Sequence, residues 1–382
     1  MNSRERVRRA LNHQEPDRVP FDLGGTGLTT IHVTAYDNLR RHLGLLPLEA
    51  RVAYMAEQLA AVDEDLGERL ETDFRPVVPG TSSRFQYVLL DEGAYQAYTD
   101  EWGIGWRKPV EGGFYYDMYK HPLAGADSLD ELLAYPFPDS LDDGRFKPLR
   151  TQAEAAASKN KAAVLAGPCA GILEIYSWLR GYEEFYVDLA LNPSYVSAML
   201  DRLVEYKCAF WERALREVGD VVDVVIEADD MAGQNAPLLS PQTYRDLIKP
   251  HHQRLFSFIK AQAPVKLFFH SCGAVRPLIP DLLEAGIDIL NPVQISAVGM
   301  DLRELKREFG RDLVFWGGGV DTQGVLGVGT PKEVREDVRR NIEALAPGGG
   351  FVFAAVHDIQ AYVPPENIVA MCEAWQEFGG YL

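Results

Sequence analysis

The chain has 382 residues, of which 47% are hydrophobic and 25% are charged, and its formal net charge at pH 7 is −18. This length suits one large α/β barrel or two average domains, and the composition is that of an ordinary globular protein. The negative charge excludes nucleic acid and anionic membrane surfaces as main partners, because both are polyanions.

Cysteine spacing and the absence of long apolar runs indicate where the protein works. The four cysteines have no paired spacing, so the sequence predicts no disulfide framework. The N-terminal stretch MNSRERVRRALNHQEPDRVPF carries charge but no apolar core of the kind found in signal peptides. No apolar run approaches the roughly 18 residues of a membrane span. We therefore expect a cytoplasmic protein.

Eight short apolar runs recur along the chain, and most are followed by turn residues and an amphipathic stretch. We expect them to be strands, at residues 18–23, 73–78, 162–167, 223–228, 265–270, 287–293, 313–318 and 351–356. Helical patterns separate the later strands, at residues 241–262, 275–286, 301–310 and 331–349. Strands that alternate with helices indicate a parallel sheet covered on both faces, and eight such units favour a (β/α)8 TIM barrel.

A long segment, residues 81–160, separates the second and third expected strands. It contains RFQYVLLDEGAYQAYTDEWGIGWRKP and GGFYYDMYKHP, which are rich in aromatic residues and nearly alternate in polarity. This pattern predicts a β-rich excursion over the barrel mouth that acts as a lid or a partner surface. No linker or low-complexity tract interrupts the chain, so we expect a single domain over residues 1–382.

The fifth expected strand, in PVKLFFHSCGAV, ends in His270 and Cys272. Two residues apart on a strand, their side chains point to the same side and can reach one point together. An imidazole and a thiolate at one point are natural zinc ligands. The alternative is a buried cysteine beside a hydrogen-bonded histidine.

Other polar side chains follow the neighbouring strands and, in a barrel, would share the face used for chemistry. They are Glu227, Asp229, Asp230, Asn291, Gln294, Trp316, Asp321, His357 and Asp358. Carboxylates with two histidines and one thiol predict a divalent metal site, and sulfur and imidazole favour zinc over magnesium or calcium. The acidic residues could instead form a solvated turn, and His357 could cap a helix. The triple glycine at 317–319 lacks the Lys-Ser/Thr of a phosphate-binding loop.

With these motifs, nearly the whole chain resembles the uroporphyrinogen decarboxylase superfamily, whose fold is a (β/α)8 barrel. The resemblance is carried by RERVRRALNHQEPDRVPFDLGG, DVVIEADDMAGQ, FFHSCGAVRPLIPDLLEAGIDILNPVQ, VFWGGGVDTQ and HDIQAYVPPENI. True decarboxylases have an arginine-bearing loop after the first strand, whereas the corresponding DLGGTGLTTIHVT has no arginine. Burying a substrate with many carboxylates without guanidinium partners would be costly, so porphyrinogen decarboxylation is disfavoured.

The chain is more similar to the zinc-dependent methyltransferases of corrinoid systems. Their signature is His-x-Cys on the fifth strand and a further cysteine before a TPxEN-like segment. Aligned on residues 364–367, that cysteine falls on His357, so the resemblance implies zinc ligation by His270, Cys272 and His357.

The fourth zinc ligand in those relatives is a carboxylate beyond strand six, where this chain has Asn291 and Gln294. We therefore expect a carboxylate from elsewhere, with Glu227 first and Asp229 or Asp230 next.

The resemblance implies an O-demethylase type of methyltransferase. A methyl group would move between a small donor, such as a methyl ether or alcohol, and the cobalt of a corrinoid (cobalamin). The chain has no Asp-x-His-x-x-Gly segment, so we expect a partner protein to carry the corrinoid. A homodimer is compatible with the resemblance, because members of the superfamily often dimerise.

Further roles follow for residues near the expected zinc. Asp230 or Asp321 would orient or protonate the leaving oxygen. Substrate contacts are expected from Asp229, Asn291, Gln294, Trp316 and Tyr176. Two alternatives stay open: a metal-free decarboxylase of a tetrapyrrole or other carboxylate, and a non-catalytic barrel that binds a ligand or a partner.

Overall fold

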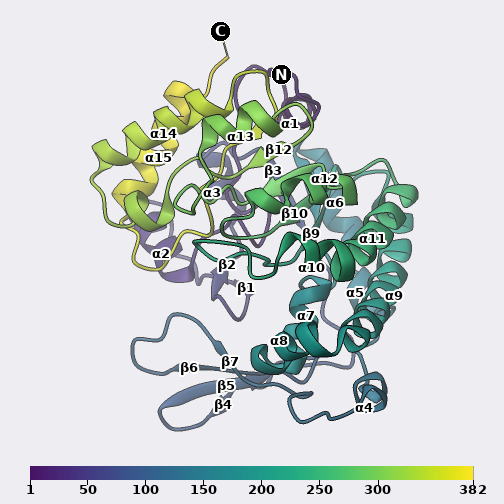
Figure 1. Ribbon diagram of the computed structural model, residues 1–382. Helices are drawn as coiled ribbons and strands as arrows, with labels where there is room; N and C mark the ends of the chain where they lie inside the picture. The colour runs from purple at the N-terminus through teal and green to yellow at the C-terminus, as the bar shows by residue number, and fades with distance from the viewer. Residues whose placement is uncertain (382) are drawn as a thin grey trace.

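Seven parallel strands form the central sheet of the computed structural model, which describes residues 1–381 (Figure 1). Their order is β13-β12-β11-β10-β9-β8-β3, so each strand lies beside its neighbour in the chain. The strands are β3 (Phe74–Val77), β8 (Ala162–Leu165), β9 (Val224–Ala228), β10 (Lys266–His270), β11 (Ile289–Asn291), β12 (Val314–Trp316) and β13 (Phe351–Val352).

An extended segment around Phe21 takes the eighth position and closes the barrel. Phe21 forms a parallel bridge with Phe353, just after β13. On its other side, the carbonyl of Phe21 accepts a hydrogen bond from the amide of Asp73, just before β3, at 2.9 Å. All eight segments that the sequence predicts as strands therefore lie in the barrel wall, and the (β/α)8 fold is confirmed.

Apolar side chains from alternate strand positions fill the barrel interior. They are Phe74, Ala162, Val164, Val224, Ile226, Phe268, Ile289, Val314, Trp316, Val352 and Ala354. Val7 and Leu11 of helix α1 (Ser3–Leu11) join this cluster from the N-terminal ends of the strands. That end of the barrel is thus plugged, and the C-terminal ends of the strands form its mouth.

Helices surround the barrel and pack against their neighbours in the ring (Figure 1). They include α2 (Val33–His42), α6 (Leu149–Ser158), α9 (Pro193–Val218), α11 (Lys249–Gln262), α12 (Ile279–Ala285), α13 (Leu302–Phe309), α14 (Pro331–Leu345) and α15 (Pro365–Phe378). Further helical segments are α3 (Glu64–Arg69), α7 (Ile172–Arg180), α8 (Tyr182–Leu191), α10 (Pro241–Thr243), η1 (Tyr244–Ile248), η2 (Arg276–Leu278) and η3 (Thr322–Leu326). No helix in residues 1–381 is both long and apolar enough to cross a membrane.

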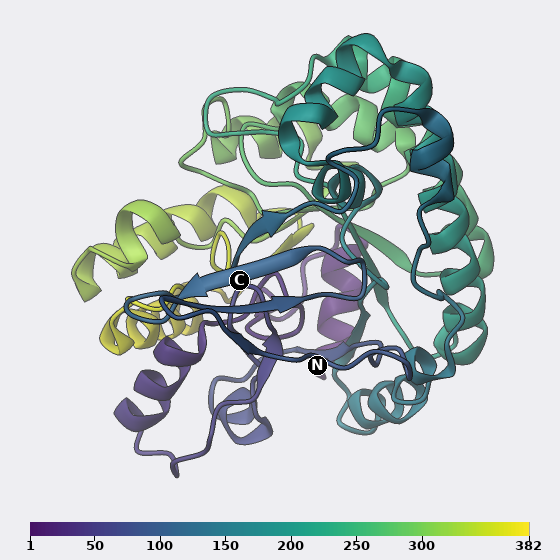
Figure 2. The same ribbon diagram turned by 90° about the horizontal axis from the view of Figure 1, so that it is seen from below.

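The excursion between β3 and β8 contains a four-stranded antiparallel sheet, which confirms the predicted β-rich segment. Its strands are β4 (Leu90–Asp91), β5 (Tyr95–Thr99), β6 (Gly105–Pro109) and β7 (Asp117–Lys120), followed by α4 (Leu129–Ala134) and α5 (Asp143–Phe146). Figure 2 shows this sheet crossing one end of the barrel. Tyr115 is hydrogen-bonded to Gln360, and Nε2 of His32 lies 3.1 Å from the carbonyl oxygen of Phe114. These contacts place the sheet at the mouth.

A buried carboxylate, Asp22, joins the closing segment to the loop that follows it. Its Oδ2 accepts hydrogen bonds from the Thr29 hydroxyl (2.6 Å) and the Trp316 indole (2.9 Å). Its Oδ1 accepts one from the amide of Gly25 (2.8 Å). The three donors favour the charged form, but burial opposes it more strongly and raises the pKa of Asp22 to about 7.

Asp22 therefore makes the free energy of unfolding depend on pH. Its folded-state pKa lies above the unfolded value of 3.8, so its contribution is fully present below that value. The contribution is lost as the pH rises through 7. Between pH 5 and pH 8 we expect the native protein to lose roughly 1–3 kcal/mol that Asp22→Asn does not lose. Urea unfolding of both proteins at both pH values measures this difference, and an equal loss in the two would contradict the raised pKa.

Candidate metal centre

Three side chains able to bind a metal meet at the mouth of the barrel. His270 ends β10, Cys272 follows two residues later, and His357 lies beyond β13. One ring nitrogen of each histidine and Sγ of Cys272 all lie within 4.8 Å of one another. Nε2 of His270 is 3.4 Å from Sγ of Cys272, and the two imidazole centroids are 5.3 Å apart. The structure thus brings together the three ligands expected from the sequence, in a set that suits zinc with an open position.

Strand alternation and a sharp turn place the first two of these residues. His270 lies two residues after Phe268, which faces the barrel interior, so its ring points into the mouth. Gly273 then turns the chain with a φ of +87°. A Cβ at this position would lie 2.5 Å from the carbonyl oxygens of Ala232 and Gly233. Only glycine fits this turn, which holds Cys272 beside His270.

Burial and carboxylates control the protonation of the ligands. Burial lowers the pKa of His270 to about 4, although Asp230 acts in the opposite direction. Burial, then Asp230, Glu174 and Asp358, raise the pKa of the Cys272 thiol well above its ordinary value. Without a metal the site therefore holds a neutral imidazole and a protonated thiol among acidic groups. A divalent cation would reverse this preference, because it favours the thiolate and attracts the carboxylates.

Asp230 is the carboxylate beside the cluster. Its Oδ1 lies 3.8 Å from Nε2 of His270 and accepts a hydrogen bond from the amide of Cys272 at 2.7 Å. Its side chain is 43% exposed, so it can reach a metal or a substrate in the mouth. Of the three acidic residues in and directly after β9, Asp230 is the one that lies beside the cluster.

Glu227, the expected fourth ligand, points away from the cluster, and this expectation is corrected. It follows Ile226, which faces the barrel interior, so its own side chain faces helix α9. Its carboxylate accepts hydrogen bonds from Nζ of Lys207 (2.7 Å) and Nε1 of Trp211 (2.6 Å). The structure assigns Glu227 to a buried ion pair between strand and helix.

Asp229 also faces the helices rather than the substrate space. Its Oδ2 lies 2.8 Å from Nε2 of His252, and its Oδ1 accepts the amide of Glu174 at 2.8 Å. The Asp229 side chain is fully buried, so a direct substrate contact is not supported. Instead, Asp229 fixes the first turn of α7.

Asn291 and Gln294 lie behind the cluster. Asn291 Oδ1 is 2.6 Å from Nδ1 of His270, and Asn291 is fully buried. Gln294 accepts a hydrogen bond from the amide of Gly273 (2.7 Å) and donates one to Gln234 (2.8 Å). These two amides support the metal-binding residues and are not placed to wall a substrate.

Three further expected site residues lie elsewhere. Asp321 caps η3 by accepting a hydrogen bond from the amide of Gln323, and it lines a separate surface cavity. Trp316 is completely buried inside the barrel. Tyr176 of α7 is also completely buried, and its hydroxyl donates to Asp188 at 2.7 Å. Their expected roles in acid–base chemistry and substrate contact are therefore corrected to roles in the scaffold.

Two acidic residues near the mouth were not predicted from the sequence. Glu174, in the first turn of α7, accepts a hydrogen bond from the amide of Gly171 at 3.3 Å. Burial, then Asp230, raise its pKa well above the ordinary value. Glu57 lies between β1 (Val52–Tyr54) and β2 (Leu59–Ala60), close enough to His357 for that histidine to affect its pKa. No sequence motif marks either residue, because the N-cap of α7 is Gly171, which has no side chain to form a capping box with Glu174.

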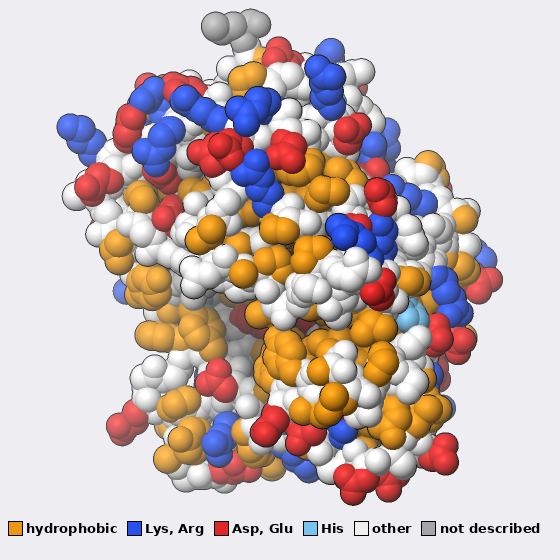
Figure 3. Space-filling model, in the orientation of Figure 1, with side chains coloured by type: hydrophobic (Ala, Val, Ile, Leu, Met, Phe, Trp, Pro, Cys, Tyr) orange, Lys and Arg blue, Asp and Glu red, His pale blue; other side chains and the backbone are white. Residues whose placement is uncertain are grey.

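A hollow opens between the barrel and the excursion sheet. Figure 3 shows acidic side chains in its depth and hydrophobic side chains on both flanks. This surface suits a small, largely apolar substrate that enters from the mouth, and it opposes a polyanionic one.

The contacts run from Cys272 through His270 to Asn291, and a cysteine, a histidine and an asparagine also form the catalytic group of some cysteine hydrolases. Two observations oppose nucleophilic catalysis by Cys272. The pKa of its thiol is raised, whereas a nucleophilic cysteine needs a lowered one. Its amide, which could otherwise help to stabilise an oxyanion, donates to Asp230. The donor set fits a metal better than a nucleophile.

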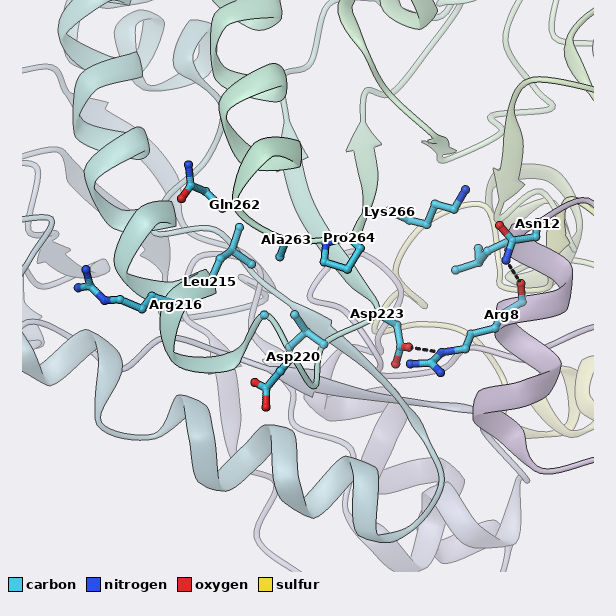
Figure 4. Close-up of a pocket in the computed structure, with 13 residues that line it drawn as sticks. Arg8, Asn12, Leu215, Arg216, Asp220, Asp223, Gln262, Ala263, Pro264 and Lys266 are labelled. Atoms are coloured by element: carbon cyan, nitrogen blue, oxygen red, sulfur yellow. Dashed lines mark hydrogen bonds and ion pairs between the residues drawn. The ribbon is translucent and has the colours of Figure 1, made fainter.

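A separate cavity of about 550 Å³ lies at the opposite end of the barrel, near the starts of β9 and β10. Figure 4 shows that Arg216 and Lys266 at its wall point apart. The charge of Arg8 is paired with Asp223, at 2.8 Å. These side chains do not converge on one point, so we assign no chemistry to this cavity.

Comparisons with known proteins agree with the fold. The model of the uroporphyrinogen decarboxylase family matches residues 119–378. Uroporphyrinogen decarboxylases from two strains of Thermus thermophilus are 29% and 28% identical over 182 residues, covering 44% of this chain and 49% of each relative. The chain thus spans about half the length of the curated relatives it matches. A solved structure of a methyltransferase from Methanosarcina mazei has a TM-score of 0.69 and 19% identity, with 99% of both chains covered.

The ion pair between Glu227 and Lys207 predicts one effect on stability and one on metal content, and the two can be measured separately. Lys207→Met should lower the free energy of unfolding by about 3–5 kcal/mol, because it leaves a buried carboxylate without its cation. Glu227→Gln should leave the amount of bound zinc unchanged, since Glu227 faces away from the cluster. Denaturant unfolding and elemental analysis measure the two effects. A Glu227→Gln protein that kept its stability but lost zinc would restore Glu227 as a ligand.

Proposed function

Because the chain belongs to the uroporphyrinogen decarboxylase family, we propose that it is a zinc-dependent methyltransferase within that family. A methyl group moves between a small donor, such as a methyl ether or alcohol, and the cobalt of a corrinoid carried by a partner protein. The observation that carries this proposal is the convergence of His270, Cys272 and His357 at the barrel mouth.

Two further observations support methyl transfer over decarboxylation. The loop at residues 22–34 has no arginine or lysine, so it offers no cation to a substrate with several carboxylates. The carboxylate of Asp230 lies beside the cluster and would repel such a substrate. The full-length likeness to a solved methyltransferase is consistent with this choice.

In this proposal the residues of the mouth have distinct tasks. His270, Cys272 and His357 would hold the metal, and a zinc ion bound there would supply Lewis acidity toward the oxygen of the methyl donor. Asp230, whose Oδ1 lies 3.8 Å from Nε2 of His270, would complete the coordination or orient the leaving oxygen. The excursion sheet limits the access of bulk water, and the partner with its corrinoid approaches the hollow seen in Figure 3.

The metal centre is tested first by zinc content. Native protein should contain about one zinc per chain, and Cys272→Ala or His270→Ala should lose it, since each removes one of three protein ligands. Cys208→Ala is the matched control, because this half-buried cysteine lies in α9, outside the cluster. Elemental analysis after purification without chelators gives the result. Equal zinc in native, Cys272→Ala and Cys208→Ala proteins would refute the site.

Methyl transfer is tested separately, with zinc-loaded protein, free cob(I)alamin and a panel of methyl ethers and alcohols. The absorbance change from cob(I)alamin to methylcobalamin should appear with native protein and be lost in Cys272→Ala. The reverse reaction from methylcobalamin to the demethylated compounds tests the other direction. Zinc binding without transfer in either direction would leave a metal centre but refute the methyltransferase.

A further inference from the structure

Asn291 is held in a single orientation by its neighbours. It ends β11, is completely buried, and lies opposite His270 in the parallel register of β10 and β11. Its Nδ2 donates a hydrogen bond to the main-chain carbonyl of Trp316 at 2.9 Å. A carbonyl oxygen can only accept, so the amide nitrogen must face Trp316. The remaining atom, Oδ1, therefore faces His270.

This orientation determines which nitrogen of His270 carries hydrogen. Oδ1 of Asn291 lies 2.6 Å from Nδ1 of His270, and a carboxamide oxygen only accepts hydrogen bonds. Nδ1 must then be the protonated nitrogen of the neutral ring. Nε2 keeps its lone pair, and Nε2 is the atom 3.4 Å from Sγ of Cys272. The lone pair is thus directed into the cluster.

Reversing the Asn291 carboxamide would be costly, so the observed orientation is strongly favoured. Turning the carboxamide over would set its oxygen against the Trp316 carbonyl and its NH2 group against the Nδ1 hydrogen of His270. Gly317 leaves the space that Asn291 needs, because a Cβ at Gly317 would lie 3.3 Å from Nδ2 of Asn291. Gly317 also has a φ of +96°, which disfavours any other residue.

We propose that Asn291 is a positioning residue of the metal centre, whose carboxamide holds His270 in the tautomer that presents Nε2 to the metal. The proposal deepens the proposed function and rests on it. It gives Asn291 a task different from the substrate contact expected from the sequence. Groups that hold the second nitrogen of a metal-binding histidine in this way set both the tautomer and the orientation of the ring.

Two substitutions separate positioning from a structural role. Asn291→Asp keeps an oxygen acceptor for Nδ1 of His270, whereas Asn291→Leu has similar size and no acceptor. The leucine cannot donate to the Trp316 carbonyl, and an ionised aspartate cannot either, so both variants should lose stability. Zinc affinity, measured by competition with a chromophoric chelator, should fall about 10- to 100-fold in Asn291→Leu only.

The outcomes of this experiment are distinct. Equal loss of affinity in both variants would show a structural role and overturn the proposal, as would affinity unchanged in both. Native protein that binds no zinc would refute the proposed function and this inference together. Native binding with an unchanged Asn291→Leu variant would refute the inference alone.

A measurement on native protein covers the case in which Asn291→Leu does not fold. In the cobalt(II)-substituted protein, the Nδ1 hydrogen of metal-bound His270 should give a paramagnetically shifted proton signal. We expect this signal to exchange slowly with water, because Asn291 and Nδ1 are buried together. A cobalt-bound protein with no slowly exchanging ring hydrogen would overturn the proposal.

Discussion

The alternation of side chains along the barrel strands decides which residues can take part in chemistry. Phe268 faces the barrel interior, so His270, two positions later, reaches the mouth. Ile226 also faces inward, and the next residue, Glu227, must therefore face the helices. Because this orientation buries the Glu227 carboxylate, Glu227 requires the cation of Lys207 as its partner. Both the position of His270 in the mouth and the ion pair behind it follow from this alternation.

Much of the fold, and part of the site, could be predicted because the signals are local. Each barrel strand is a short apolar run, and the His-x-Cys spacing places two ligands together without any knowledge of the rest. The carboxylate beside the cluster could not be identified, because the sequence does not show that Glu227 is paired with Lys207 and Trp211 of α9. Trp316 and Tyr176 show the same limit for aromatic residues, since sequence does not distinguish a residue inside the core from one that lines a pocket.

Several features of the barrel mouth destabilise the protein when no ligand is bound there. Buried acidic groups lie near one another, and the pKa of Asp358 is raised to about 6 by its burial. Burial holds both Cys272 and His270 in the neutral form, because a charged side chain loses more hydration free energy than a neutral one when it is buried. Shifts of this kind are concentrated at functional sites, where the environment is suited to a bound species rather than to water. The rest of the barrel, with its dense apolar interior, tolerates this local cost.

The bridge between Phe21 and Phe353 also has a consequence for how the protein is made. The two residues are separated by nearly the whole chain, and their pairing closes the barrel. During synthesis the segment around Phe21 cannot pair with its second neighbour until β13 has been made. Closure of the barrel is therefore a late, non-local event. His357 follows β13, so it joins His270 and Cys272 only after the last strand of the barrel has been made.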